Sequence, residues 1–250
     1  MEKREDLNKY LRAYSNDFKF KNENEIYLNK FADIIKEDLS TNFIENYLSF
    51  GIGHKIVSNS IIENGILTKR IKNYYIIDGS KELLDSFKNS HQNIPNLHFI
   101  HTYFEDFDIP LLFDRIEMGF ILEHVDDPLF ILSKYKNYLK SNGKIHIAVP
   151  NAKSLHRLIG YYSGLLNDLY QLSEYDLMLG HKRYYDIDTI KHDILSSGLQ
   201  ITKIIGLMLK PITNEQMKIL GFNDNIIKAL VKIGENYPEI ANCIYLCATK

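Results

Sequence analysis

The sequence predicts an α/β fold with a doubly wound, mostly parallel sheet. Short β-rich runs alternate with helical patterns along most of the chain, which is typical of this class. Two of these runs end in residues that suit a ligand site: the strand–turn–helix stretch 46–56, NYLSFGIGHKI, and the strand–acid–helix stretch 74–80, YYIIDGS. Open α/β sheets bind ligands at the carboxyl ends of their strands. We therefore expect the functional site at that edge.

The composition is that of an ordinary globular protein, with 250 residues, 45% hydrophobic and 25% charged residues, and a formal net charge of -2. This charge favours neither nucleic acid nor an anionic membrane as a partner. No apolar run approaches the roughly 20 residues that span a bilayer, and the first ten residues lack the apolar core of a signal peptide. We expect a cytoplasmic protein that binds no nucleic acid and no membrane. Monomer and homodimer both stay open.

The two cysteines, Cys243 and Cys247, lie four residues apart in a predicted strand. At about 3.3 Å per residue they would be separated by roughly 13 Å, which is too far for a disulfide. We expect both to be core thiols in a reducing compartment.

The glycine turn at Gly51, Ile52 and Gly53 lets the backbone turn sharply and lets a ligand come close. The helix that follows offers backbone N–H groups to an anionic group. The dinucleotide fingerprint would need a third glycine at Ile56, so NAD is disfavoured. A glycine turn without any ligand stays an alternative.

The second motif places Asp78 at the end of a strand, about 25 residues after the glycine turn. A carboxylate in that position can accept hydrogen bonds from a ribose diol. Gly79 and the N-cap candidate Ser80 follow, so the alternative is a helix-capping aspartate.

The remaining elements follow from hydrophobic periodicity, caps and turn residues. Asp127 and Pro128 are a good helix start, and that helix should run through Leu139 and end near Gly143. The other expected helices are 27–39, 155–170, 188–197, 214–220 and 224–234, and the other expected strands are 97–100, 113–120, 144–150, 199–209 and 240–248.

The stretch from Phe113 and Asp114 through Leu122, Glu123, His124 and Val125 to Asp127 and Pro128 resembles the small-molecule branch of the class I S-adenosylmethionine-dependent methyltransferases. That branch includes ubiquinone-pathway O-methyltransferases and deoxyaminosugar N-methyltransferases. The segments GKIHIAVPNAKSL and GHKRYYDIDTIKHDILSSGLQITKIIG are also similar to the family, so the resemblance covers roughly residues 44–250. Two positions depart from its pattern: Ser49 replaces an acid, and Lys55 replaces a frequent third glycine.

The resemblance implies a Rossmann-like fold with seven strands, the last of them antiparallel, and S-adenosylmethionine as the cofactor. Residues 44–250 would form the methyltransferase domain and residues 1–43 an N-terminal helical arm or lid. A helical insertion at about 152–185 would cover the substrate, or else would only extend the core.

The resemblance also implies which residues hold the cofactor. The loop after the third strand has Tyr103 where an aspartate is common, so Phe104 with Glu105 or Asp106 would contact the adenine. The complete expected set is Gly51, Ile52, Gly53, Asp78, Gly79, Phe104, Glu105, Met118 and Gly119.

For catalysis, His124 would be the base that removes the acceptor's proton, because the unperturbed pKa of histidine lies near working pH. Tyr14, His181 and Arg183 would bind the substrate. Metal-assisted members of the family use a further acid where this chain has Phe120, and the adjacent Glu123 and His124 are too few ligands for a hard cation. We expect no metal.

The sequence thus predicts a methyltransferase that acts on oxygen or nitrogen of a small polar metabolite. A nucleotide-sugar, a phosphorylated compound and a small acid are all compatible with it. The alternatives are a catalytically inactive binding or regulatory protein of the same fold and an NAD-dependent sugar-modifying enzyme.

Overall fold

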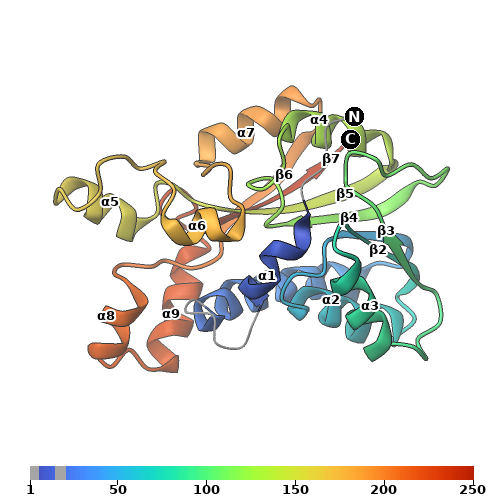
Figure 1. Cartoon of the computed structure of the whole chain (residues 1–250), viewed down its shortest axis with the longest axis horizontal. Coiled ribbons are helices and arrows are strands. Elements are labelled where there is room, and N and C mark those ends of the chain that lie inside the picture. Colours follow the sequence, from blue (N-terminus) through green and yellow to red (C-terminus); the bar gives the residue numbers. More distant parts are fainter. Residues whose placement is uncertain (1–5, 15–20) are drawn as a thin grey trace. The chain divides into compact units, whose positions relative to one another are not determined.

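The computed structural model describes residues 6–14 and 21–250. Its strands form one seven-stranded sheet in the order β3-β2-β1-β4-β5-β7-β6 (Figure 1). The strands are β1 Ile44–Phe50, β2 Ile71–Asp78, β3 Leu97–His101, β4 Phe113–Gly119, β5 Leu139–Pro150, β6 Gln200–Gly206 and β7 Cys243–Thr249. The pairs β1–β2, β1–β4 and β2–β3 are parallel, whereas β7 runs antiparallel to both β5 and β6. The predicted fold class is confirmed.

Helices connect most of the consecutive strands, as the sequence predicts. They are η1 Leu7–Tyr14, α1 Lys21–Thr41, α2 Ile56–Ile61, η2 Ile62–Ile66, α3 Lys81–Ser90, α4 Pro128–Asn137, α5 Leu155–Tyr162, α6 Glu174–Leu179, α7 Ile187–Ser196, α8 Asn214–Ile219 and α9 Asp224–Gly234. Within residues 6–14 and 21–250, none of them combines the length and the apolar character needed to cross a bilayer.

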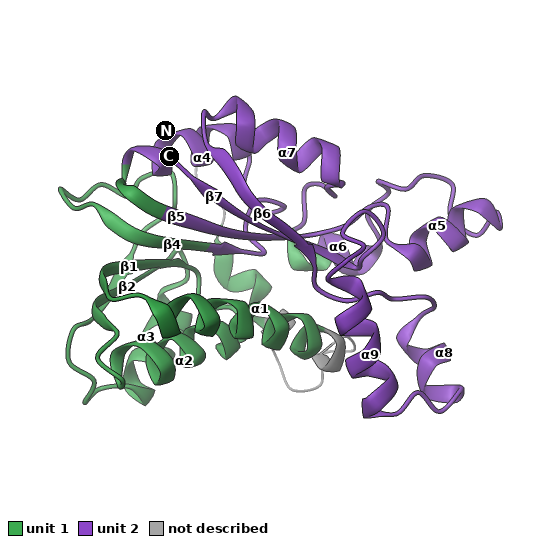
Figure 2. Ribbon diagram, turned by 180° about the vertical axis from the view of Figure 1, so that it is seen from behind, with its two compact units in different colours: residues 1–117, 138–143, 178–180 green, residues 118–137, 144–177, 181–250 purple. Residues whose placement is uncertain are grey.

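The chain divides into two compact units, which Figure 2 colours separately. Unit 1 comprises residues 1–117, 138–143 and 178–180, and unit 2 comprises residues 118–137, 144–177 and 181–250. The predicted division into an arm of residues 1–43, a domain of residues 44–250 and an insertion at about 152–185 stays a prediction.

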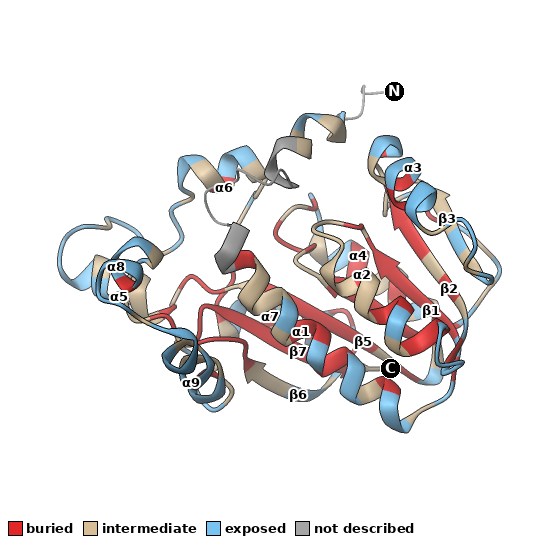
Figure 3. Cartoon of the chain, turned by 90° about the horizontal axis from the view of Figure 1, so that it is seen from below, coloured by how far each residue is buried: buried red, intermediate tan, exposed pale blue. Residues whose placement is uncertain are grey.

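Each unit has its own buried apolar residues (Figure 3). In unit 1, α1 buries the face formed by Phe31, Ile35 and Leu39, and all residues of β1 except Glu45 are buried. In unit 2, β7 is buried from Cys243 to Ala248. Both cysteines are buried free thiols there, as predicted.

The starts of α3 and α4 were predicted correctly from their capping residues. The Asp127 carboxylate accepts the N–H of Phe130 at 2.9 Å and Pro128 is the first helical residue, so α4 begins where the sequence predicts. The Ser80 hydroxyl accepts the N–H of Leu83 at 3.3 Å and caps α3.

The predicted end of α4 is wrong, because the helix stops at Asn137 and β5 already begins at Leu139. Gly143 is therefore not a helix stop. A Cβ on it would lie 2.8 Å from Leu139 Cδ2 and 3.0 Å from the Phe113 carbonyl oxygen, so glycine is needed for close backbone approach within the strand.

The predicted helix at 155–170 is wrong beyond Tyr162. Gly164 takes a φ of 76°, and Leu165 N–H bonds back to the Gly160 carbonyl at 2.8 Å, which ends α5. Leu165 is 86% exposed, so the leucine spacing that suggested a longer helix does not reflect burial.

Candidate functional site

The glycine turn follows β1 in unit 1 with the expected left-handed backbone. The φ angles of Gly51 and Gly53 are 68° and 50°. Lys55, at the position where the resemblance implies glycine, also has a positive φ of 67°, and its N–H bonds to the Ile52 carbonyl at 2.9 Å. The lysine therefore keeps the turn geometry, at the steric cost that L-residues have in this region.

Asp78 ends β2 and joins it to the glycine turn. Its Oδ2 accepts the N–H of Ile52 at 3.0 Å and its Oδ1 accepts the N–H of Ser80 at 2.7 Å. The side chain is buried, which raises its pKa, while the two backbone N–H groups act in the opposite direction. A carboxylate oxygen has two lone pairs, so these bonds leave capacity for hydroxyl donors.

The short helix η1 contacts this strand end within unit 1. The hydroxyl of Ser80 donates to Asn8 Oδ1 at 2.8 Å. A Cβ on Gly79 would lie 2.6 Å from Leu7 Cδ1, so the glycine permits the contact. Tyr14 is the last residue of η1, but its side chain is not among those that the structure describes.

Two further predicted cofactor residues follow β3. The ring of Phe104 packs on that of Phe50, the residue before the glycine turn, with centroids 4.7 Å apart. Glu105 follows it and is half-buried. Met118 and Gly119 are the last residues of β4 and belong to unit 2, where Met118 is fully buried.

Sequence reasoning missed Glu117 of β4, which pairs in register with Ser49 of β1. Both residues are buried, and the Ser49 hydroxyl accepts the Tyr74 hydroxyl at 2.9 Å. Beside the position where Ser49 replaces the family's usual acid, the neighbouring strand thus supplies a carboxyl group. The available signal was a single glutamate inside the apolar strand.

In unit 2, the segment after β4 carries Glu123 and His124. The His124 ring packs edge-on against His181, with centroids 4.8 Å apart and planes at 77°. The N–H of Lys182 bonds to the Glu123 carbonyl at 2.8 Å, which joins the two segments. The structure therefore brings His181 to the predicted base.

Arg183 lies in the same segment, but its guanidinium bonds to the backbone. Nη1 donates to the carbonyls of Leu122, at 2.9 Å, and Val125, and Nη2 donates to that of Asp126 at 3.0 Å. These bonds fix the loop that presents His124.

Asp176 of α6 is a second residue that sequence reasoning missed. Its Oδ1 lies 3.2 Å from His181 Nδ1 and accepts the Tyr184 hydroxyl at 3.0 Å. Its Oδ2 accepts the N–H and the hydroxyl of Ser173 at 2.7 and 2.6 Å. Although burial alone would raise its pKa, the nearby His181 ring and the hydrogen bonds from Ser173 lower it to about 2, so the carboxylate is ionised.

Comparison with known proteins identifies the fold and the domain. Residues 48–147 match the sequence model of a family described as a methyltransferase domain. No curated protein matches the sequence.

Three similar solved structures are methyltransferases, and at these identities they show the fold. The N-methyltransferase NodS from Bradyrhizobium japonicum WM9, in complex with S-adenosyl-L-homocysteine, is 11% identical, with a TM-score of 0.61 over 96% of each chain. An S-adenosylmethionine-dependent methyltransferase from Clostridium acetobutylicum ATCC 824 is 14% identical, with a TM-score of 0.61 over 97% of this chain and 98% of the other. The plantazolicin methyltransferase BpumL, in complex with S-adenosyl-L-homocysteine, is 16% identical, with a TM-score of 0.58 over 97% of this chain and 89% of the other.

Residues 48–147 thus match a methyltransferase domain, and the chain has the fold of the class I S-adenosylmethionine-dependent methyltransferases, in agreement with the family, enzyme class and cofactor predicted from the sequence.

Proposed function

We propose that this methyltransferase transfers a methyl group to an oxygen or nitrogen of a small polar metabolite, with a nucleotide-sugar, a phosphorylated compound or a small acid as the candidate acceptors. Methyl transfer from a sulfonium is an in-line displacement, so much of the rate can come from holding the acceptor in line with the methyl group. The remaining chemical task is to remove the acceptor's proton.

The cofactor would be held by the glycine turn and the strand ends of the fold. The backbone at Gly51–Gly53 would lie along the methionine part, and Asp78 would accept the ribose hydroxyls while it keeps its bond to Ile52. Phe104 with Glu105 would contact the adenine, and Met118 with Gly119 would line the sulfonium side. The register pairing of Glu117 with Ser49 supports a further role for Glu117 near the amino group of the methionine part.

The packing of His124 on His181 is the observation that carries the catalytic part of the proposal. Two imidazoles at this spacing offer ring nitrogens to which the acceptor's proton can pass. His124 is the base in this mechanism, and His181 with the positive charge of Arg183 orients the acceptor. Tyr14 and the arm of residues 1–43 would close over the substrate, and residues 152–185 would cover it.

To test the proposal, the enzyme is incubated with methyl-labelled S-adenosylmethionine and with panels of nucleotide-sugars, phosphorylated metabolites and small acids, and transfer of the label is measured. Once an acceptor is found, His124→Gln should lower turnover by about 10² to 10⁴, the usual effect of removing a general base, and should leave cofactor binding intact. The matched control is His192→Gln, because His192 is exposed on α7. Turnover of His124→Gln at the wild-type rate would exclude His124 as the base.

A further inference from the structure

Glu123, His124 and His181 form a cluster of metal-binding side chains in unit 2. One ligand atom from each of the three lies within 4.8 Å of the other two. The cluster combines two adjacent residues with one from a segment 57 positions later, which is why the sequence pattern offered only two ligands.

The Glu123 carboxyl group is the most unusual member of this cluster. It is 1% exposed, and among the described residues neither of its oxygens has a hydrogen-bond partner. Burial raises its pKa to about 7, against the opposing charges of His181 and Arg183. Leaving a buried carboxyl group without partners costs free energy, and a bound cation would remove that cost.

His181 is oriented in the way that proteins orient metal ligands. A histidine that binds a metal through one ring nitrogen almost always donates its other N–H to a carboxylate or a carbonyl group. His181 Nδ1 lies 3.2 Å from Asp176 Oδ1, and a small rotation of the ring would make this contact a regular hydrogen bond. Asp176 is itself fixed by Ser173 and Tyr184, so Nε2 of His181 is the nitrogen left for a metal.

The geometry points to a binding site for a divalent transition-metal ion of the zinc type, with Glu123, His124 and His181 as ligands and Asp176 as a positioning residue. Two imidazoles and one carboxylate suit Zn²⁺, Co²⁺ or Ni²⁺, whereas Mg²⁺ prefers an all-oxygen shell. In a tetrahedral zinc site with bonds of about 2.0–2.1 Å, ligand atoms lie about 3.4 Å apart. Rotations of the three side chains that move their ligand atoms by about an ångström would therefore bring these atoms into bonding distance of one ion. The fourth coordination position would be left for water.

Metal binding would oppose methyl transfer, because it uses the imidazole lone pair that accepts the acceptor's proton. A protein loaded with zinc should therefore be a slow methyltransferase until a chelator removes the ion. This consequence rests on the proposed base role of His124, whereas the binding itself does not.

In the test, Co²⁺ is titrated into the full chain after any affinity tag and bound metal have been removed, and binding is followed by the visible d–d absorption bands of the bound ion. Calorimetry with Zn²⁺ gives the binding affinity. The wild type should bind one ion. Glu123→Gln and His181→Gln each remove a ligand and should lower the affinity by more than the tenfold to hundredfold expected for Asp176→Asn, which removes only the orienting carboxylate. His192→Gln, on the exposed face of α7, is the control and should bind like the wild type.

The proposal is overturned if the wild type shows neither d–d bands nor heat of binding, or if Glu123→Gln and His181→Gln bind as tightly as the wild type. Near-ultraviolet circular dichroism and S-adenosylhomocysteine binding show whether each variant is folded. The two substitutions lie in different segments, so His181→Gln decides the question alone if Glu123→Gln fails to fold. Because metal binding is measured without an acceptor, its failure is separate from failure of the proposed methyl transfer.

Discussion

The carboxylate of Asp78 accepts the backbone N–H of Ile52 at 3.0 Å, across the 26 residues that separate the end of β2 from the glycine turn. A second bond, from the N–H of Ser80, holds the other oxygen. The aspartate expected to bind a ribose thus also fixes the loop that would bind the rest of the cofactor.

Asp78→Ala should lower the affinity for S-adenosylhomocysteine about tenfold or more, because charge-assisted hydrogen bonds contribute roughly 1.5–3 kcal/mol each. Asp78→Asn keeps one oxygen acceptor and should fall between the wild type and the alanine variant. Calorimetry gives the affinities, and Asp85→Ala, at an exposed position of α3, is the control. Wild-type affinity in a folded Asp78→Ala protein would reduce Asp78 to a helix-capping role.

Lys55→Gly should stabilise the protein by about 1 kcal/mol, since glycine has no Cβ clash at positive φ. Lys55→Ala retains the Cβ and should bring no such gain. Urea unfolding measures both. If the glycine variant is less stable than the wild type, the lysine side chain makes contacts that outweigh its backbone strain.

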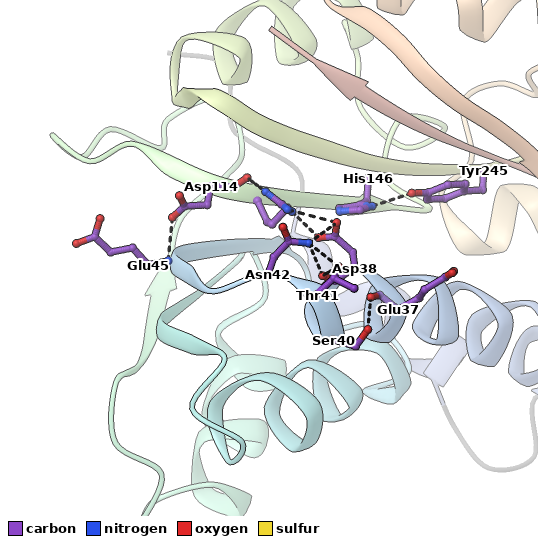
Figure 4. A network of polar contacts seen from close by, with 10 residues as sticks. Glu37, Asp38, Ser40, Thr41, Asn42, Glu45, Asp114, His146 and Tyr245 are labelled. Atoms are coloured by element: carbon purple, nitrogen blue, oxygen red, sulfur yellow. Dashed lines mark hydrogen bonds and ion pairs between the residues drawn. The ribbon is translucent and has the colours of Figure 1, made fainter.

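Asp38→Ala should destabilise the protein by about 3–5 kcal/mol, because it leaves the buried guanidinium of Arg115 without its carboxylate. The ion pair joins α1 to β4 within unit 1, and only 6% of the Arg115 side chain and 11% of the Asp38 side chain are exposed. Figure 4 shows Asp38 among its polar contacts. Asp33→Ala, on the exposed side of the same helix, is the matched control for denaturant unfolding. Equal losses of unfolding free energy in Asp38→Ala and Asp33→Ala would mean that the ion pair does not stabilise the protein.

The buried His156 should make the protein less stable in mild acid. Burial and the nearby charges of Lys210 and Arg157 lower its pKa from 6.5 to about 3. The unfolded chain therefore binds this proton first as the pH falls, so stability that is full above pH 6.5 decreases progressively toward pH 3. Between pH 7 and pH 5 the loss from this one group should be about 1–2 kcal/mol.

His156→Gln should remove this part of the pH dependence. The measurement is the free energy of unfolding of wild type and variant at several pH values between 5 and 8. Parallel pH profiles for the two proteins would contradict the assignment to His156.

The sequence predicted those parts of the fold that local chemistry decides. Asp127 with Pro128 located the start of α4, because a cap and a proline act within a few residues. Gly143 misled the prediction of its end. Glycine is required there because the backbone of Phe113, 30 positions earlier in the chain, comes close. The residues around Gly143 do not indicate this contact.

The candidate site divides in the same way. His124 and His181 were predicted from motifs, but Asp176 beside His181 and Glu117 beside Ser49 were not. The pairing of Glu117 with Ser49 depends on strand register, and the contact of Asp176 with His181 depends on the turn that follows α6. Both arise only when the chain has folded.

The most direct test of the cofactor site at Gly51–Gly53 and Asp78 is calorimetry of the full chain with S-adenosylmethionine, S-adenosylhomocysteine and NAD. We predict that S-adenosylmethionine and S-adenosylhomocysteine bind and that NAD does not. Asp78→Ala should weaken the binding of both S-adenosylmethionine and S-adenosylhomocysteine. Binding of NAD without any response to S-adenosylmethionine or S-adenosylhomocysteine would contradict it.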